Sequence, residues 1–176
     1  MKKGRVSGAV NCVAVFGSGK VSEHEPAYQQ AVRLGKALAQ KHCTVLHGGY
    51  RGVMEGVAKG CRLAGWPNTG LTIQGKKKPG VWVDKVMAMP SWQSRLFKLI
   101  EKPDAYVFLD GATGTLAEFF VVLEMTNRRL LSKPIVILGK DLRKLLLGLQ
   151  KCPHFETPSN LYFAGSVPDV LRFLKK

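Results

Sequence analysis

The sequence lacks any apolar run that approaches the roughly 20 residues of a membrane-spanning helix. Its first apolar stretch, residues 10–16, contains Asn11 and Cys12 and ends at Gly17. A stretch this short and this interrupted fits a first strand better than the core of a signal peptide. We therefore expect no membrane association.

Cysteine is scarce and is not arranged for chemistry. The four cysteines are Cys12, Cys43, Cys61 and Cys152. No two of them have the spacing of a metal-binding pair or a redox pair. Three of them have apolar neighbours and are expected to be small buried hydrophobic residues. This usage indicates a reducing, cytoplasmic location without structural disulfides, and we predict no metal site and no cofactor.

Acidic residues are few, at 12 against 27 lysines and arginines, and the formal net charge is +15. Such a surplus attracts polyanions or anionic substrates. The basic residues are spread along the chain apart from Lys76-Lys-Lys78, and no basic patch is interleaved with aromatic residues. Three explanations of the positive charge remain. An ordinary solvated surface ranks first, attraction of phosphate groups ranks second, and nucleic-acid binding ranks third.

The 176 residues alternate short apolar runs with amphipathic segments. We expect residues 1–9 to be a flexible N-terminal segment and residues 10–176 to form a single α/β domain. The apolar runs predict strands at 11–16, 44–47, 69–73, 85–89, 105–109, 133–138 and 161–163. Strands that alternate with helices predict a doubly wound, Rossmann-like parallel sheet with helices on both faces.

One motif carries most of the chemistry, Asp110-Gly-Ala-Thr-Gly-Thr-Leu-Ala-Glu118. It follows the apolar run 105–109 and opens a long segment typical of a helix. A strand, a glycine turn and a helix in this order direct free backbone N–H groups and the positive end of the helix dipole at the turn. The predicted guest is an anion, most often a phosphate, bound by Gly111, Thr113, Gly114 and Thr115.

The same stretch has a purely structural explanation. Thr115 and Glu118 fit a capping box, with Thr115 as the N-cap residue and Glu118 at the third helical position. On local grounds alone this explanation is the favoured one for Glu118. Asp110 is either a titratable residue of the site or a turn residue.

Two further glycine turns follow predicted strands. Gly17-Ser-Gly-Lys20 is neither a full G-x-G-x-x-G motif nor a P-loop, and Ser18 is either a phosphate donor or a simple turn residue. Gly48 and Gly49 permit either close approach of a ligand to the backbone or a tight turn. Arg95 shares one side of the predicted helix 90–100 with Ser91 and Lys98. An ordinary amphipathic helix with a polar outer face would show the same pattern.

In their order along residues 10 to 140, these motifs resemble the LOG ("lonely guy") family of nucleoside 5′-monophosphate phosphoribohydrolases, long mislabelled as lysine decarboxylases. Residues 111–118 are similar to the family's Gly-Gly-x-Gly-Thr-x-x-Glu. Gly48, Gly49, Gly52 and Met54 match its Gly-Gly-Gly-x-x-Gly-x-Met-Gly, and Arg95 matches the arginine of Met-x-x-Arg-Lys. The sequence departs from the family at Tyr50, Glu55, Trp92, Leu96, Asp110 and Ala112.

The resemblance implies hydrolysis of the N-glycosidic bond between ribose 5-phosphate and a purine or cytokinin base. It implies that Glu118 and Arg95 are catalytic, and that the substrate or its phosphate is bound by Gly17, Ser18, Gly48, Gly49, Met54, Gly111, Thr113, Gly114 and Thr115. It implies no cofactor. The decarboxylase label gains no support, because no lysine has a position that indicates a pyridoxal-phosphate Schiff base.

The helix after Glu118 is apolar on nearly every side, as shown by Phe119, Phe120, Val121, Val122, Leu123 and Met125. Such a helix is buried in a core or by another subunit. LOG-like proteins are dimers, and the resemblance implies at least a homodimer here. Three functional classes stay open, namely a nucleotide hydrolase, a non-catalytic carrier or sensor of a phosphorylated nucleotide or cofactor, and a nucleic-acid-binding module.

Overall fold

Seven strands form one parallel sheet in the computed structural model, which describes residues 10–174. The strand order is β4-β3-β2-β1-β5-β6-β7, and every neighbouring pair is parallel. The predicted fold class is confirmed, whereas the predicted flexible segment 1–9 lies outside the described residues. The strands are β1 (Cys12–Phe16), β2 (Thr44–His47), β3 (Asn68–Ile73), β4 (Lys85–Met89), β5 (Ala105–Phe108), β6 (Ile135–Ile137) and β7 (Leu161–Phe163).

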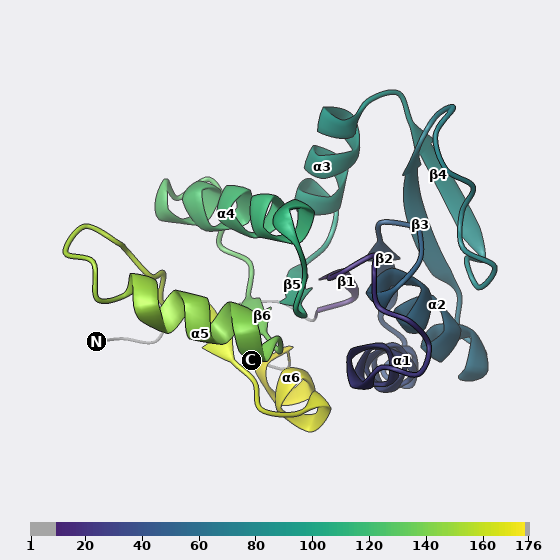
Figure 1. Cartoon of the computed structure of the whole chain (residues 1–176), viewed down its shortest axis with the longest axis horizontal. Helices are drawn as coiled ribbons and strands as arrows, with labels where there is room; N and C mark the ends of the chain where they lie inside the picture. Colours follow the sequence, from purple (N-terminus) through teal and green to yellow (C-terminus); the bar gives the residue numbers. More distant parts are fainter. Residues whose placement is uncertain (1–9, 175–176) are drawn as a thin grey trace.

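Six helices cover the two faces of this sheet. Figure 1 shows α1, α2 and α6 on one side and α3, α4 and α5 on the other. The helices are α1 (Pro26–Ala39), α2 (Val53–Leu63), α3 (Trp92–Glu101), α4 (Thr113–Asn127), α5 (Lys140–Leu149) and α6 (Val167–Leu174). Along β1, Val13 and Val15 enter one hydrophobic core while Ala14 and Phe16 enter the other, as the period of two in a strand requires. Burial on both faces explains why the inner strands β1, β5 and β6 read as continuous apolar runs, whereas the edge strands β4 and β7 are less buried.

The strand order reverses at β1. The chain moves from β1 through β2 and β3 to β4 on one side, and then returns to β5 on the other side of β1. In open α/β sheets a ligand binds at such a reversal, beyond the carboxyl ends of the strands. The register pairs Phe16 with Phe108 and Val15 with His47, so the turns after β1, β2 and β5 meet at this edge.

Two cysteines are buried, where the sequence predicts three. Cys43 and Cys61 are buried, Cys12 is half-buried, Cys152 is exposed, and all four are free thiols. Burial raises the pKa of the Cys61 thiol to about 12, so it stays protonated and unreactive at neutral pH. Among residues 10–174, every helix is too short or too polar to cross a membrane.

Candidate functional site

Helix α4 begins three residues earlier than the capping box predicts. Its N-cap residue is Ala112, in an extended conformation and without a side-chain cap. Thr115 is therefore the third residue of the helix, and Glu118 lies beyond its first turn. The predicted capping box is wrong, and the Glu118 carboxylate instead faces a residue on another helix.

The turn before α4 leaves a row of backbone donors without partners. Within residues 10–174, the N–H groups of residues 111–115 donate to no acceptor. A Cβ added at Gly114 would meet nothing within 4 Å, so the backbone is open on that side. These donors lie at the positive end of the α4 dipole, an arrangement that binds phosphate and other anions.

The neighbouring helix α5 already has an anion at its own N-terminus. The Asp110 carboxylate accepts the backbone N–H groups of Lys140 (2.9 Å), Asp141 (2.9 Å) and Leu142 (3.0 Å). Asp110 therefore caps α5 from a distance, which decides its role in favour of structure over chemistry. Of the two helices that flank this turn, α4 is the one whose first donors remain available to a ligand.

Arg95 is buried, with 7% of its surface exposed, and every part of its guanidinium has a partner. Its Nε donates to the Leu71 carbonyl at 2.7 Å and its Nη2 donates to the Gly48 carbonyl at 3.1 Å. Its Nη1 lies 3.5 Å from Oε1 of Glu118. The explanation of Arg95 as part of a polar outer face is therefore wrong, because α3 points this side chain inward across the ends of β2 and β3.

Glu118 is a carboxyl group poised between its two protonation states. Its side chain is 13% exposed. Burial raises the pKa of Glu118 to about 7, although the Arg95 guanidinium acts in the opposite direction. Both the acid and the carboxylate are consequently populated near neutral pH, which suits a group that takes up and releases a proton.

The glycine turns bring these groups together by close packing. A Cβ at Gly48 would collide with the Arg95 guanidinium and the Met54 sulfur, and a Cβ at Gly17 would collide with Val53. Gly49 has φ +75°, a conformation that favours glycine. The structure thus places Gly17, Gly48, Gly49 and Met54 at one edge, as the sequence predicts.

Ser18 joins the turn after β1 to the turn after β5. Its N–H donates to the Asp110 carbonyl at 2.9 Å, and its carbonyl accepts from Val53 N–H at 2.8 Å. Its Oγ accepts from Lys20 N–H at 3.1 Å, which is the geometry of a turn residue. The hydroxyl proton has no acceptor among residues 10–174, so Ser18 can still donate to a ligand.

Sequence reasoning missed two residues beside this site. The Tyr50 hydroxyl accepts from Ile73 N–H at 3.0 Å, and its ring centroid lies 5.6 Å from the Arg95 guanidinium carbon. His47 is fully buried directly before the glycine turn. The available signals were an aromatic residue where the LOG pattern often has glycine, and a polar residue at the end of an apolar strand.

A model of the SLOG cluster4 family matches residues 10–155. The chain belongs to this family. A rice relative (Oryza sativa subsp. japonica) is named as the probable cytokinin riboside 5′-monophosphate phosphoribohydrolase LOGL9. It is 31% identical over 172 residues, which cover 93% of this chain and 76% of the rice protein. The resemblance of this SLOG protein to the LOG family is therefore confirmed.

Solved structures share the fold of this SLOG protein. The molybdenum cofactor binding protein of Rippkaea orientalis has a TM-score of 0.77 at 21% identity, with 94% of this chain and 96% of that chain covered. The molybdenum cofactor carrier protein of Chlamydomonas reinhardtii has a TM-score of 0.72 at 24% identity, with 95% and 99% covered. At these identities the likeness is one of fold.

Proposed function

We propose that this SLOG protein hydrolyses the N-glycosidic bond of a purine or cytokinin nucleoside 5′-monophosphate, giving the free base and ribose 5-phosphate. The observation that carries the proposal is the buried pair of Arg95 and Glu118. The pKa of Glu118 is raised to about 7. Glu118 also lies on α4, whose N-terminus offers the free backbone donors. The names of the curated relatives support the same reaction.

The proposed reaction uses two parts of α4, namely the backbone N–H groups at its N-terminus and the side chain of Glu118. The donors of residues 111–115 hold the 5′-phosphate and thereby place the ribose beside Glu118. When the bond between the anomeric carbon and the base nitrogen breaks, positive charge develops on the ribose and the Glu118 carboxylate stabilises it. Water then adds to the anomeric carbon and gives one proton to Glu118, while the departing base keeps the bonding electron pair and takes up a proton from solvent water. Glu118 afterwards returns its proton to solvent, which restores the carboxylate.

Arg95 has a different role because its guanidinium stays charged at neutral pH. The Leu71 and Gly48 carbonyls fix its position, and Arg95 in turn orients the Glu118 carboxylate. It also adds positive charge to the neighbourhood in which an anionic substrate binds.

The phosphate anchor is tested by comparing a nucleoside 5′-monophosphate with the matching nucleoside. Because the anchor places the ribose, kcat/KM for free-base release should be at least about 100-fold higher with the monophosphate, or about 2.7 kcal/mol in transition-state binding. Equal values for the two compounds would contradict an anchor at α4.

A glycine substitution tests the anion site without disturbing the fold. Gly114→Ala adds a methyl group where the backbone is open, so it should not lower the melting temperature. The same methyl group projects toward the N-terminus of α4 and should weaken binding of a nucleoside monophosphate about tenfold. Titration followed by amide NMR measures the affinity, and wild-type binding should shift the amide signals of residues 111–115.

Gly148→Ala is the matched control, because a Cβ at Gly148 in α5 also meets nothing within 4 Å. It should leave nucleotide affinity unchanged. If the amide signals of residues 111–115 do not move on titration of the wild-type protein, phosphate does not bind at this turn.

The second candidate is a non-catalytic carrier or sensor of a phosphorylated nucleotide or cofactor. The free donors of α4 would hold the phosphate of such a ligand equally well, and the neighbours from R. orientalis and C. reinhardtii are named for the molybdenum cofactor. Nucleotide binding without hydrolysis of any base would favour this candidate. The cytoplasmic location and the absence of a nucleic-acid partner stay predictions.

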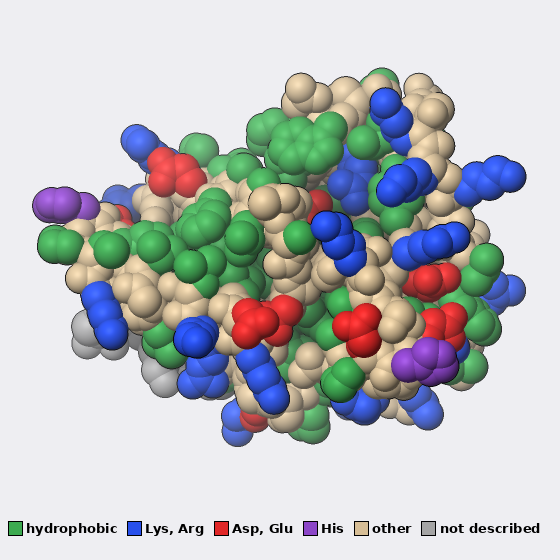
Figure 2. Space-filling model, in the orientation of Figure 1, with side chains coloured by type: hydrophobic (Ala, Val, Ile, Leu, Met, Phe, Trp, Pro, Cys, Tyr) green, Lys and Arg blue, Asp and Glu red, His purple; other side chains and the backbone are tan. Residues whose placement is uncertain are grey.

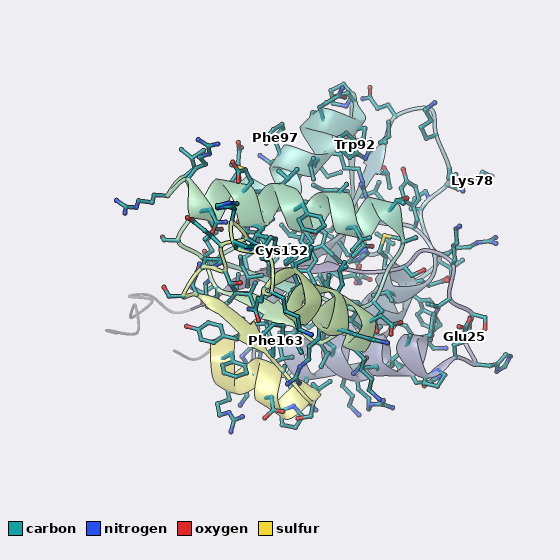
Figure 3. All side chains as sticks on the ribbon, turned by 60° about the vertical axis from the view of Figure 1, so that its left-hand side comes forward. Glu25, Lys78, Trp92, Phe97, Cys152 and Phe163 are labelled. Atoms are coloured by element: carbon teal, nitrogen blue, oxygen red, sulfur yellow. The ribbon has the colours of Figure 1, made fainter. Side chains whose placement is uncertain are left out.

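We expect the protein to act as a homodimer or a larger homo-oligomer. Helix α4 buries Phe119, Val122 and Leu123 in its own chain but leaves Phe120 37% exposed. On α3, Trp92 and Phe97 are 46% and 44% exposed and project outward in Figure 3. Hydrophobic side chains gather over α3 and α4 in Figure 2, a pattern typical of an interaction surface.

Light scattering at micromolar concentration should therefore report at least a dimer. Trp92→Lys together with Phe97→Lys should shift the protein toward a monomer, because two charges would be desolvated in the interface. Leu147→Lys is the matched control, since that exposed leucine lies on α5. A monomeric wild-type protein would show that this apolar surface has another role.

A further inference from the structure

His47 is a fully buried histidine that the mechanism above does not use. Its Nδ1 accepts the backbone N–H of Gly49 at 3.1 Å, and its Nε2 lies 2.9 Å from Oδ1 of Asn68. A backbone N–H only donates, so Nδ1 must be unprotonated. An amide oxygen only accepts, so Nε2 must carry the proton.

The orientation of the Asn68 amide follows from its other partners. Its Nδ2 donates to the carbonyls of Ala58 (3.4 Å) and Trp82 (3.1 Å) and to Oδ2 of Asp84 (2.6 Å). Three acceptors around one nitrogen leave the amide oxygen for His47. The imidazole is therefore the neutral Nε2–H tautomer, and burial, which lowers the pKa of His47 to about 4, keeps it neutral at physiological pH.

The group that His47 holds is the peptide between Gly48 and Gly49. The N–H of this peptide donates to His47, and its carbonyl accepts from Nη2 of Arg95 at 3.1 Å. A peptide group is planar, so its N–H and its carbonyl turn together. The imidazole consequently determines where the carbonyl that binds Arg95 points.

The hydrogen bonds from Arg95 through the Gly48–Gly49 peptide and His47 to Asn68 continue into the β3–β4 loop, residues 74–84. The Asp84 carboxylate also accepts the backbone N–H of Asn68 at 3.1 Å, and the N–H of Gly80 donates to the Gly49 carbonyl at 2.9 Å. The β3–β4 loop therefore supports the glycine turn in two ways, through Asp84 and Asn68 and through Gly80.

We infer that His47 is a positioning residue of the proposed hydrolase, which acts through the Gly48–Gly49 peptide to hold Arg95 against Glu118 without touching the substrate. Its effect on turnover rests on the proposed function. Its effect on the ionisation of Glu118 does not, because the contact between Arg95 and Glu118 is present whatever the ligand.

Two substitutions separate the two nitrogen atoms of His47. In His47→Asn the amide oxygen stands near the place of Nδ1 and still accepts from Gly49, but the contact to Asn68 is lost. In His47→Gln the amide nitrogen reaches the place of Nε2 and still donates to Asn68, but Gly49 loses its acceptor. Each variant loses one buried hydrogen bond, so similar decreases in melting temperature are expected.

The discriminating measurement is the pKa of Glu118, obtained by carbon-13 NMR of the full chain labelled at glutamate. Arg95 lowers this pKa, so loosening Arg95 in His47→Gln should raise it by about half a unit, part of the shift that an adjacent arginine produces. His47→Asn should stay close to the wild type. In turnover, His47→Gln should lower kcat about tenfold with little change in KM, as for a group that acts only in the transition state.

An unchanged pKa of Glu118 in His47→Gln, or equal shifts in both variants, would overturn the inference. Nitrogen-15 NMR of the wild-type histidines supplies a test that needs no variant to fold. It should find Nδ1 of His47 unprotonated and Nε2 protonated at pH 7, and a charged ring or an Nδ1–H tautomer would overturn the inference. If no nucleotide is hydrolysed but the pKa of Glu118 shifts as expected, the proposed function fails while the role of His47 in positioning Arg95 stands.

Discussion

Glu118→Gln is expected to lower hydrolysis of a nucleoside monophosphate by about two orders of magnitude or more, the scale of one acid–base group. Glutamine keeps the size and the hydrogen-bonding oxygen of the side chain but cannot carry the charge that stabilises an oxocarbenium-like ribose. It also cannot accept a proton from water. The measurement is the rate of free-base release at saturating nucleotide, and wild-type turnover in this variant would contradict the mechanism.

The pH dependence of stability supplies the control for this variant, because a pKa that differs between the folded and unfolded chain changes the free energy of unfolding with pH. The pKa of Glu118 rises from 4.5 to about 7 on folding, so between these values the folded chain binds more protons than the unfolded chain. The stabilising contribution of protonated Glu118 is therefore fully present below about pH 4.5 and is lost as the pH rises through about 7. Glutamine has no proton to lose, so the variant should be no less stable than the wild type at pH 8. A large loss of stability there would mean that the charged carboxylate supports the fold.

Arg95→Ala is expected to reduce both turnover and stability. It removes the partner of Glu118 and leaves the Leu71 and Gly48 carbonyls without their donor. Each buried acceptor left unsatisfied costs about 1–3 kcal/mol, so urea unfolding should show a loss of a few kcal/mol. Free-base release should fall at least about tenfold, partly through weaker substrate binding, and the pKa of Glu118 should rise above its wild-type value.

Arg95→Lys is the informative comparison for that loss. Lysine retains the positive charge, but its single ammonium lacks the planar fork that reaches Leu71, Gly48 and Glu118 together. Its turnover and stability should lie between those of Arg95→Ala and the wild type. An Arg95→Ala protein with normal stability and normal turnover would show that Arg95 neither braces the turn nor serves the reaction.

The sheet was predictable because its signals are local. Each strand is a short apolar run that ends at a glycine, a proline or a polar residue, and β2, β4 and β7 begin and end where the sequence predicts. In inner strands such as β5 and β6, burial on both faces makes the runs continuous, so these runs are visible without information about their neighbours. The glycine turns were equally visible, because Gly17, Gly48 and Gly49 lie directly after strands.

The site was less predictable because its decisive contacts join distant segments. Thr115 and Glu118 satisfy a local capping rule, yet α4 begins at Thr113 and Glu118 faces Arg95 on α3. Only the resemblance to the LOG family, and no spacing rule, associated these two residues. Asp110 looked like a turn residue or a titratable group, but its partners are backbone N–H groups of α5, which no side-chain pattern reveals.

The most direct test of the proposed reaction is product analysis with the wild-type protein. A panel of purine and cytokinin nucleoside 5′-monophosphates is incubated with the purified chain, and free base and ribose 5-phosphate are quantified together over time. The proposal predicts that at least one nucleotide is consumed with equimolar release of both products, and that Glu118→Gln in parallel releases neither at a comparable rate. Quantitative recovery of every intact nucleotide, including those that bind, would contradict the hydrolase and leave the carrier.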